Sequence, residues 1–351
     1  MLTESQSRTR IAGVPLIQFL LGCAATALGL GLCELLLHWS GTDRNHWLGL
    51  IRDANWWLAG AALMGMAVNL LLAALKWRRV EGCLAGTMPS YAHAVAMTAI
   101  GTGVGQLLPT PVASVIVRGL GNRVSQRSGR HGALASAWEQ LFDLGAAALL
   151  TAPAIVALAR NRVSDFAIGF ALALLTGEIG AVAVPKLLVS LFRLDKSLCN
   201  AALCRMLWRL SLLRTVILIL VTVVIAASVH SGIRSWWVAA AVPPVMLAAV
   251  LSFLPAGIGA NELSFVGLLG LAGVAAPVST AFALANRVIQ VLIALVLAGA
   301  GSATVAFRWG RLRNASDDAQ GGGASGKTLA QPLDGVECRS QQDEQRGIAS
   351  P

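Results

Sequence analysis

The chain has 351 residues, of which 56% are hydrophobic and 13% are charged, with a net charge of +10 and a mean hydropathy of +0.69. About a quarter of the residues of a soluble globular protein are charged, so this composition excludes an ordinary soluble domain. The charges gather in short loops and in the tail after Phe307, with long apolar stretches between them. The sequence therefore predicts a multi-pass membrane protein.

The basic residues lie beside the apolar stretches, where topology and anionic lipid headgroups explain them. We therefore expect a membrane lipid as the partner, and no nucleic acid. The six cysteines and five histidines do not have the spacing of metal ligands. We accordingly predict no metal site and no cofactor.

Apolar stretches of about 20 residues or more predict membrane-spanning helices. The six that we predict as full spans are 14–37, 55–75, 131–159, 164–192, 212–231 and 279–306. Two further apolar regions, 90–121 and 235–274, are interrupted by prolines and glycines, which end helices. We predict an all-α polytopic membrane helical bundle of six full spans and two broken or re-entrant helical hairpins, eight membrane segments in total.

The positions of Arg and Lys favour hairpins over single crossings at the two breaks. A hairpin over 90–121 keeps the basic cluster between Arg118 and Arg130 in the cytoplasm, whereas one crossing would place it outside. A kinked crossing is the alternative. The two hairpins would enter from opposite faces, which gives a weak inverted repeat.

This topology places both termini in the cytoplasm and the protein in the cell (inner) membrane. It divides the chain into an N-terminal segment, 1–13, a transmembrane domain, 14–307, and a disordered cytoplasmic tail, 308–351.

Ionisable residues at membrane depth cost about 2.5–3.5 kcal/mol each on insertion scales, so they indicate candidate functional positions. Glu139 and Asp143 are four residues apart, and therefore share one helix face near mid-membrane. Arg118 and Arg287 are the candidate cationic partners. The alternative is that such pairs only fix the helix packing. Glu178, alone in its span, is predicted to pair structurally more than to act in transport.

The two breaks can each place a helix N-terminus inside the membrane, where free N–H groups attract a phosphate or a carboxylate. Thr110 and Asn261 are predicted N-caps, with Pro111 at the first helical position. Glu262 either belongs to this site or only caps its own helix. The other residues expected to line the site at the breaks are Pro109, Pro255, Gly257 and Gly259.

Three blocks of residues, taken in order, resemble the flippase-like integral membrane family related to the transmembrane region of lysylphosphatidylglycerol synthases. The resemblance extends from about Pro15 to Phe307. The blocks are Leu107-Leu108-Pro109 followed by Arg118, then Glu139 with Asp143, and then Leu254 to Glu262 with Asn286-Arg287.

The chain also departs from the family pattern. Gln140 and Asn261 stand where that pattern commonly has arginine, and the segment from Thr110 to Ser114 lacks its usual glycines. Fewer cations are therefore present for a headgroup. The synthases also carry a soluble aminoacyl-transfer domain after the membrane region, whereas this chain has a short polar tail there. The resemblance thus implies lipid handling without the transferase.

Three functions follow as hypotheses. The first is a translocator of an anionic phospholipid or a polyprenyl-linked glycolipid, with a headgroup site formed by Arg118, Glu139, Asp143, Glu262 and Arg287. The second is a non-transporting accessory subunit for a lipid-modifying or glycosyltransferase partner. The third, a membrane enzyme, is the weakest, because the sequence shows no nucleophile–base set, and we predict that the protein is not an enzyme.

Overall fold

The computed structural model describes residues 10–11, 14–15, 31–41 and 44–321. The chain divides into unit 1, Met1–Ala306, and unit 2, Phe307–Pro351. The part of unit 2 that the structure describes is the C-terminal end of helix α11, Ala276–Gly321.

The described part of unit 1 is built of helices, apart from two strands of two residues each, β1 (Arg10–Ile11) and β2 (Val14–Pro15), which pair antiparallel. Residues 31–40 are also helical. The remaining elements up to the end of α7 are α2 (Arg44–Arg52), α3 (Trp56–Ala85), α4 (Tyr91–Val104), α5 (Thr110–Val124), α6 (Gly129–Arg160) and α7 (Val163–Phe192). They are followed by η1 (Lys196–Cys199), α8 (Ala201–Ser228), α9 (Ser235–Leu251), η2 (Pro255–Gly257) and α10 (Ala260–Leu271).

Five helices of the described chain are long and apolar enough to cross a membrane: α3, α6, α7, α8 and the part of α11 from Ala276 to Phe307. This confirms the predicted helical, multi-pass membrane protein. The predicted first span, 14–37, lies partly outside the described residues. Its start is wrong, because Val14 and Pro15 form β2; a residue before proline is restricted to extended conformations.

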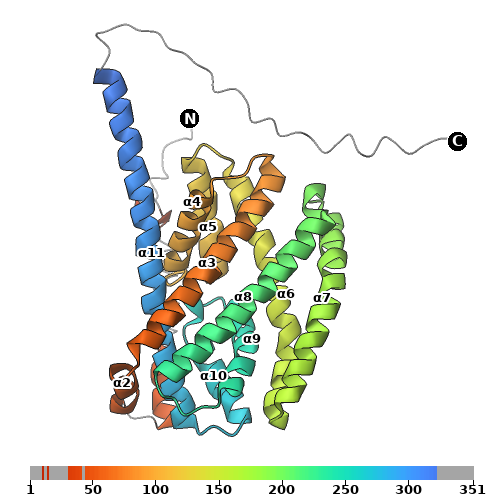
Figure 1. Ribbon diagram of the computed structural model, residues 1–351, viewed down its shortest axis with the longest axis vertical. Coiled ribbons are helices and arrows are strands. Elements are labelled where there is room, and N and C mark those ends of the chain that lie inside the picture. Colours follow the sequence, from red (N-terminus) through yellow and green to blue (C-terminus); the bar gives the residue numbers. More distant parts are fainter. Residues whose placement is uncertain (1–9, 12–13, 16–30, 42–43, 322–351) are drawn as a thin grey trace, which may run out of the picture. The chain divides into compact units, whose positions relative to one another are not determined.

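Two helix packings organise unit 1. Helices α3 and α8 lie side by side and cross one face diagonally, and α6 packs against α3, α5, α7, α8 and α9 (Figure 1). The helices α4 and α5 lie at one end of unit 1, and α9 and α10 lie at the other. Helix α6 therefore contacts elements from both ends and carries side chains between them.

The ends of two spans differ from the prediction. Helix α3 continues to Ala85 rather than residue 75, and α8 begins at Ala201 rather than residue 212. The prediction ended the first span before Lys76 and began the second after Arg209, but both residues lie inside the helices. Lys76 faces the carboxylate of Asp143.

At each predicted break, two short helices follow one another. Helix α4 packs against α5, and α9 packs against α10. These four helices have 14, 15, 17 and 12 residues, fewer than the roughly 20 that a full crossing needs. Helix α5 also contacts η2. The two interrupted segments, about 130 residues apart in the sequence, therefore meet.

Candidate functional site

A buried polar group joins the three helices α3, α6 and α8. Lys76 of α3 is fully buried, and its Nζ donates to Asp143 Oδ1 at 2.6 Å, to Ser211 Oγ at 2.7 Å and to the backbone oxygen of Glu139 at 3.2 Å. An ammonium group has three protons, so these acceptors satisfy all of them. Lys76 is thus held between three helices by these acceptors.

Arg214 of α8 completes this group. Its guanidinium pairs with Oδ2 of Asp143, and its Nε donates to Asn69 Oδ1 at 2.9 Å. We call Lys76, Asp143 and Arg214 the polar triad. Counted with their usual charges, the two basic side chains and one carboxylate have a net charge of one positive unit. The side chains of Asp143 and Arg214 are 23% and 17% exposed, whereas that of Lys76 is 0% exposed, so Asp143 and Arg214 form the partly exposed part of the triad.

Arg118 and Glu139 form a second buried pair next to the triad. The Arg118 guanidinium pairs with Glu139, donates to Thr98 Oγ1 at 3.0 Å and to Ser136 Oγ at 3.2 Å, and lies 5.3 Å from the centre of the Trp77 ring. This pair confirms Arg118 as the predicted partner of Glu139. It is connected to the triad, because Lys76 bonds the backbone of Glu139.

The second break holds its own ion pair. Arg287 Nε lies 3.2 Å from Glu262 Oε1, and the Arg287 Nη2 donates to the backbone oxygen of Ala256 at 2.8 Å. Asn261 Nδ2 donates to the same oxygen at 3.2 Å. Ala256 has a φ of 47°, which is sparsely populated for a residue with a Cβ. Two donors therefore hold the strained residue at the tip of the break.

The capping residues differ from those predicted. In the first break, Pro109 is the N-cap of α5, and Thr110 and Pro111 follow it inside the helix; no side chain caps this end. Because the N-cap residue is proline, its side chain cannot accept a hydrogen bond from the first N–H groups of α5.

In the second break the N-cap is Gly259, not Asn261, and its N–H donates to Glu262 Oε2 at 2.6 Å. Glu262 therefore caps its own helix, which is the second of the two roles predicted for this residue. The N-terminus of α10 therefore carries its own carboxylate.

A small cavity of about 130 Å³ lies beside the Glu262–Arg287 pair. Its polar lining consists of Thr222, Asn261, Glu262, Asn286, Arg287 and Gln290. Gln290 donates to Asn286 at 3.3 Å. The structure therefore divides the predicted site residues into two groups: Arg118, Glu139 and Asp143 in one, and Glu262 with Arg287 in the other, at the breaks that α5 and η2 bring into contact.

The prediction did not include Lys76 and Arg214. A signal for Lys76 was present, because Asn69, Ala73, Lys76 and Val80 follow the spacing of one helix face and all four are buried. Asn69 and Lys76 contact Arg214 and Ser211, which are three residues apart on α8. Pairing two such polar faces would have located the triad.

Two other charged pairs have different surroundings. Glu81, which is fully buried, accepts from Asn122 Nδ2 at 2.6 Å and from Arg127 Nε at 3.0 Å near the ends of α3 and α5. Glu178 of α7 pairs with Arg209 of α8 at 2.7 Å, and the Arg209 side chain is 69% exposed. Glu178 thus has the structural partner that was predicted for it.

The chemistry that these groups offer is electrostatic. Buried cations with satisfied hydrogen bonds, one positive charge in excess, and a partly exposed Arg214 suit an anionic oxygen such as that of a phosphate. Asp143 lies 14 residues into α6 and Arg214 lies 13 residues into α8, which is about 20 Å from the helix ends at roughly 1.5 Å per residue. Asp143 and Arg214 are thus near the middle of their candidate spans, and Lys76 lies 20 residues into α3.

Comparison with protein families agrees with this architecture. The family model named for the lysylphosphatidylglycerol synthase TM region matches residues 19–299 of the sequence. These residues include the triad, both breaks and both buried pairs. Neither a comparison with curated proteins nor one with solved structures gives a match. The family match spans most of the chain, and the chain therefore belongs to the family of the lysylphosphatidylglycerol synthase transmembrane region.

Proposed function

We propose that this protein translocates or handles an anionic phospholipid or a polyprenyl-linked glycolipid, and that it does no chemistry on the lipid. The observation that carries the proposal is the polar triad, a group with one excess positive charge at mid-depth in a bundle of apolar helices. Such a charge is costly in a membrane unless it has a use or a partner. An anionic headgroup at Arg214 would neutralise it.

The two breaks support the same function. In this proposal α4 with α5, and α9 with α10, are re-entrant hairpins from opposite faces that meet where α5 contacts η2. Non-helical backbone at membrane depth is tolerated where it is covered by protein or lines a polar cavity. The cavity beside Glu262 and Arg287 is such a place. Together the breaks and the triad form a polar route for a headgroup.

Charge placement supports cytoplasmic termini in the cell (inner) membrane. The connections after α3, α5 and α7 lie at the end of unit 1 where α4 and α5 lie, and those after α6, α8 and α10 lie at the other end. The basic residues near the first end are Arg78, Arg79, Arg123, Arg127, Arg130, Arg193 and Lys196, and those near the second are Arg44, Arg52, Arg160, Arg162 and Arg234. The more basic first end is the cytoplasmic one.

The test measures transport by the purified full-length protein in liposomes that contain fluorescent phosphatidylglycerol. A membrane-impermeant quencher reports how fast the inner-leaflet lipid reaches the outer leaflet. Arg214→Gln removes the excess charge and leaves the Lys76–Asp143 pair neutral, so the variant should fold. We expect its transport rate to fall about tenfold or more, because a hydrogen bond to a charged group contributes about 1.5–3 kcal/mol.

Arg205→Gln is the matched control. Arg205 is an exposed arginine on the same helix, and its loss should leave the rate unchanged. Full transport in both Arg214→Gln and Asp143→Asn would show that the triad is not the headgroup site. No transport by the unaltered protein of either phosphatidylglycerol or a polyprenyl-phosphate lipid would contradict translocation itself.

An accessory role is the second candidate, and the Glu178–Arg209 pair favours it. The pair lies near the middle of α7 with Arg209 mostly exposed, where lipid would be a poor environment for a charge and a partner subunit would be a better one. Co-purification of a lipid-modifying enzyme or a glycosyltransferase that is lost on Arg209→Leu with Glu178→Leu would support this role.

A further inference from the structure

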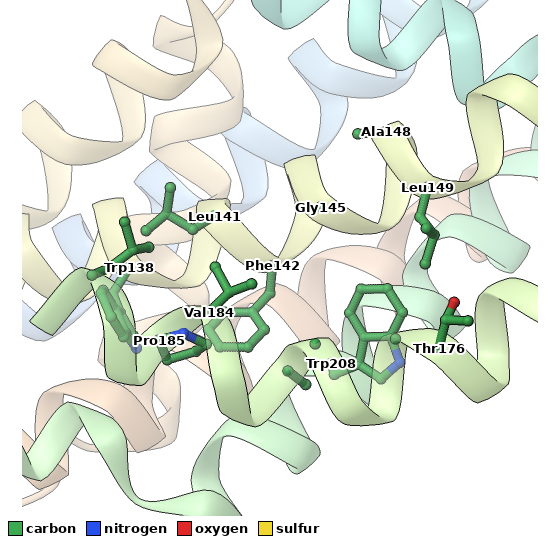
Figure 2. Close-up of a pocket in the computed structure, with 14 residues that line it drawn as sticks. Trp138, Leu141, Phe142, Gly145, Ala148, Leu149, Thr176, Val184, Pro185 and Trp208 are labelled. Atoms are coloured by element: carbon green, nitrogen blue, oxygen red, sulfur yellow. The ribbon is translucent and has the colours of Figure 1, made fainter.

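A long apolar cleft lies between α6 and α7, away from the polar triad. Its volume is about 460 Å³, within the range of about 300–1,000 Å³ that is typical of small-molecule sites. Figure 2 shows Trp138 with Pro185 at one end, Phe142 between, and Trp208 with Thr176 at the other. Apart from Thr176 and the two indoles, the side chains that line it are apolar.

The sequence explains why α6 and α7 separate at this level. Toward the C-terminus of α6 the two helices are in close contact, since a Cβ on Gly169 would lie 2.0 Å from Pro153 Cβ. Farther along, the Trp208 indole of α8 inserts between them. A Cβ on Gly177 would lie 1.8 Å from this ring, so only glycine fits there. The indole therefore acts as a spacer that holds the cleft open.

The cleft is elongated along the helices. Its lining on α6 runs from Trp138 to Leu149, about 17 Å at roughly 1.5 Å per residue. The three helices that form it, α6, α7 and α8, are all candidate spans. The cleft thus lies at membrane depth and is shaped for an extended chain.

The two indoles give the cleft a chemical preference. Trp138 is 2% exposed and Trp208 is 4% exposed, and the Nε1 of each has no hydrogen-bond partner among the residues that the structure describes. Tryptophan N–H groups usually find a partner when buried. Trp138 lies nine residues from the start of α6, and thus at the end of the cleft nearer the basic connections.

We propose that the cleft holds one acyl chain of an ester-linked phospholipid, with the ester carbonyl accepting from Trp138 Nε1 and the chain extending toward Leu149 and Thr176. An isoprenoid chain has no carbonyl to offer, so the donor favours the phospholipid over the polyprenyl-linked lipid. This inference rests on the proposed lipid function and specifies the class of lipid. The headgroup would lie at the basic end.

The test uses the full-length protein in phosphatidylcholine vesicles that contain a phosphatidylglycerol with a diazirine on one ester-linked acyl chain. After illumination, mass spectrometry maps the cross-links. We expect them on α6 between Leu141 and Leu149 and on α7 between Thr176 and Leu188. Gly180→Phe should remove most of them, because a Cβ at Gly180 meets nothing within 4 Å and the ring would fill the cleft.

Ile179→Phe is the matched control. Ile179 is the neighbouring residue, 75% exposed and outside the lining, so its cross-links should stay as in the unaltered protein. Equal labelling of the cleft in Gly180→Phe and Ile179→Phe would overturn the proposal, because the labelling would then come from the surrounding bilayer.

Trp138→Phe tests the carbonyl contact and keeps an aromatic ring. Unlabelled diester phosphatidylglycerol should compete with the probe about threefold to tenfold better than the diether analogue, the usual contribution of one hydrogen bond. Trp138→Phe should abolish this difference. Equal competition by the diether lipid in the unaltered protein, or better competition by polyprenyl phosphate, would overturn the assignment.

This experiment is independent of transport. Arg214→Gln, which keeps the Lys76–Asp143 pair, should slow transport and leave labelling of the cleft intact. Normal transport with no labelling of the cleft in the unaltered protein would refute the cleft alone, whereas labelling without transport would refute the proposed function alone.

Discussion

At the scale of single residues, buried charges in this protein belong to two kinds of surroundings. Arg118 and Glu139 are both about 2% exposed and are enclosed by Thr98, Ser136 and Trp77. Glu178 and Arg209 also form an ion pair, but the Arg209 side chain is largely exposed. We therefore expect the Arg118–Glu139 pair to affect the stability of the protein more than the Glu178–Arg209 pair does.

Removing one member of the buried pair should be costly. Glu139→Gln leaves the Arg118 guanidinium buried without its carboxylate, which costs about 3–5 kcal/mol. We expect the double variant Arg118→Met with Glu139→Leu to be more stable than either single variant, because no charge then remains buried. Thermal unfolding in detergent measures this.

The control is the exposed pair. Glu178→Gln should lower the stability less than Glu139→Gln does, because the largely exposed Arg209 side chain can turn toward the interface when it loses its partner. A Glu139→Gln variant as stable as Glu178→Gln would contradict the structural importance of the Arg118–Glu139 pair.

Sequence reasoning found these carboxylates but not all of their partners. Glu139 and Asp143 were identifiable, because a carboxylate inside a long apolar stretch has no other explanation. Lys76 was assigned to a span end, since a basic residue beside an apolar run is ordinarily a cytoplasmic flank. Arg214 lay inside the predicted span 212–231 and was not among the predicted partners. Only the contact between α3, α6 and α8 shows that they face Asp143.

At the scale of elements, the second break depends on its backbone conformation. Gly257 has a φ of 68°, and a Cβ there would lie 2.9 Å from Ala249 Cβ and 3.0 Å from the Asn261 amide. Arg287 and Asn261 both bond the neighbouring Ala256 oxygen. Break and ion pair are therefore one structural unit.

Gly257→Ala should destabilise the protein by about 1–3 kcal/mol, the usual cost of a residue held in a sparsely populated conformation. Gly267→Ala is the matched control on α10, where a Cβ meets nothing within 4 Å and alanine is a better helix former by up to about 1 kcal/mol. Thermal unfolding of the two variants compares them. A Gly257→Ala variant as stable as Gly267→Ala would show that the break is adaptable.

The sequence located both breaks, because prolines and glycines in an apolar run mark helix ends directly. It did not locate the caps. Thr110 and Asn261 are the residue types that usually cap, yet Pro109 and Gly259 occupy the N-cap positions. The geometry of each tip depends on its tertiary contacts, here those of Arg287 with Ala256 and Glu262, and local preference does not contain them.

At the scale of the whole molecule, the proposed topology has two hairpins that enter from opposite faces. In a variant without its native cysteines, Met88→Cys and Ser125→Cys flank α4 and α5, and Ser235→Cys and Ala275→Cys flank α9 and α10. We expect a membrane-impermeant thiol reagent to label the first two from the cytoplasm and the last two from the other side. All four positions are exposed.

Labelling of Met88→Cys and Ser125→Cys from opposite sides would mean that α4 and α5 form one kinked crossing. The equivalent result for Ser235→Cys and Ala275→Cys would mean the same for α9 and α10. Either outcome would also change the number of crossings, and with it the side on which the basic end of unit 1 lies.

The polar triad also limits how this protein could be redesigned for another cargo. Asp143 holds α3 through Lys76 and α8 through Arg214, so a substitution there would alter the assembly of three helices together with any headgroup preference. Asn69 and Ser211 each touch only one of the two cations. Selectivity is thus best diversified at these two neutral positions, with the charged residues left in place as scaffold.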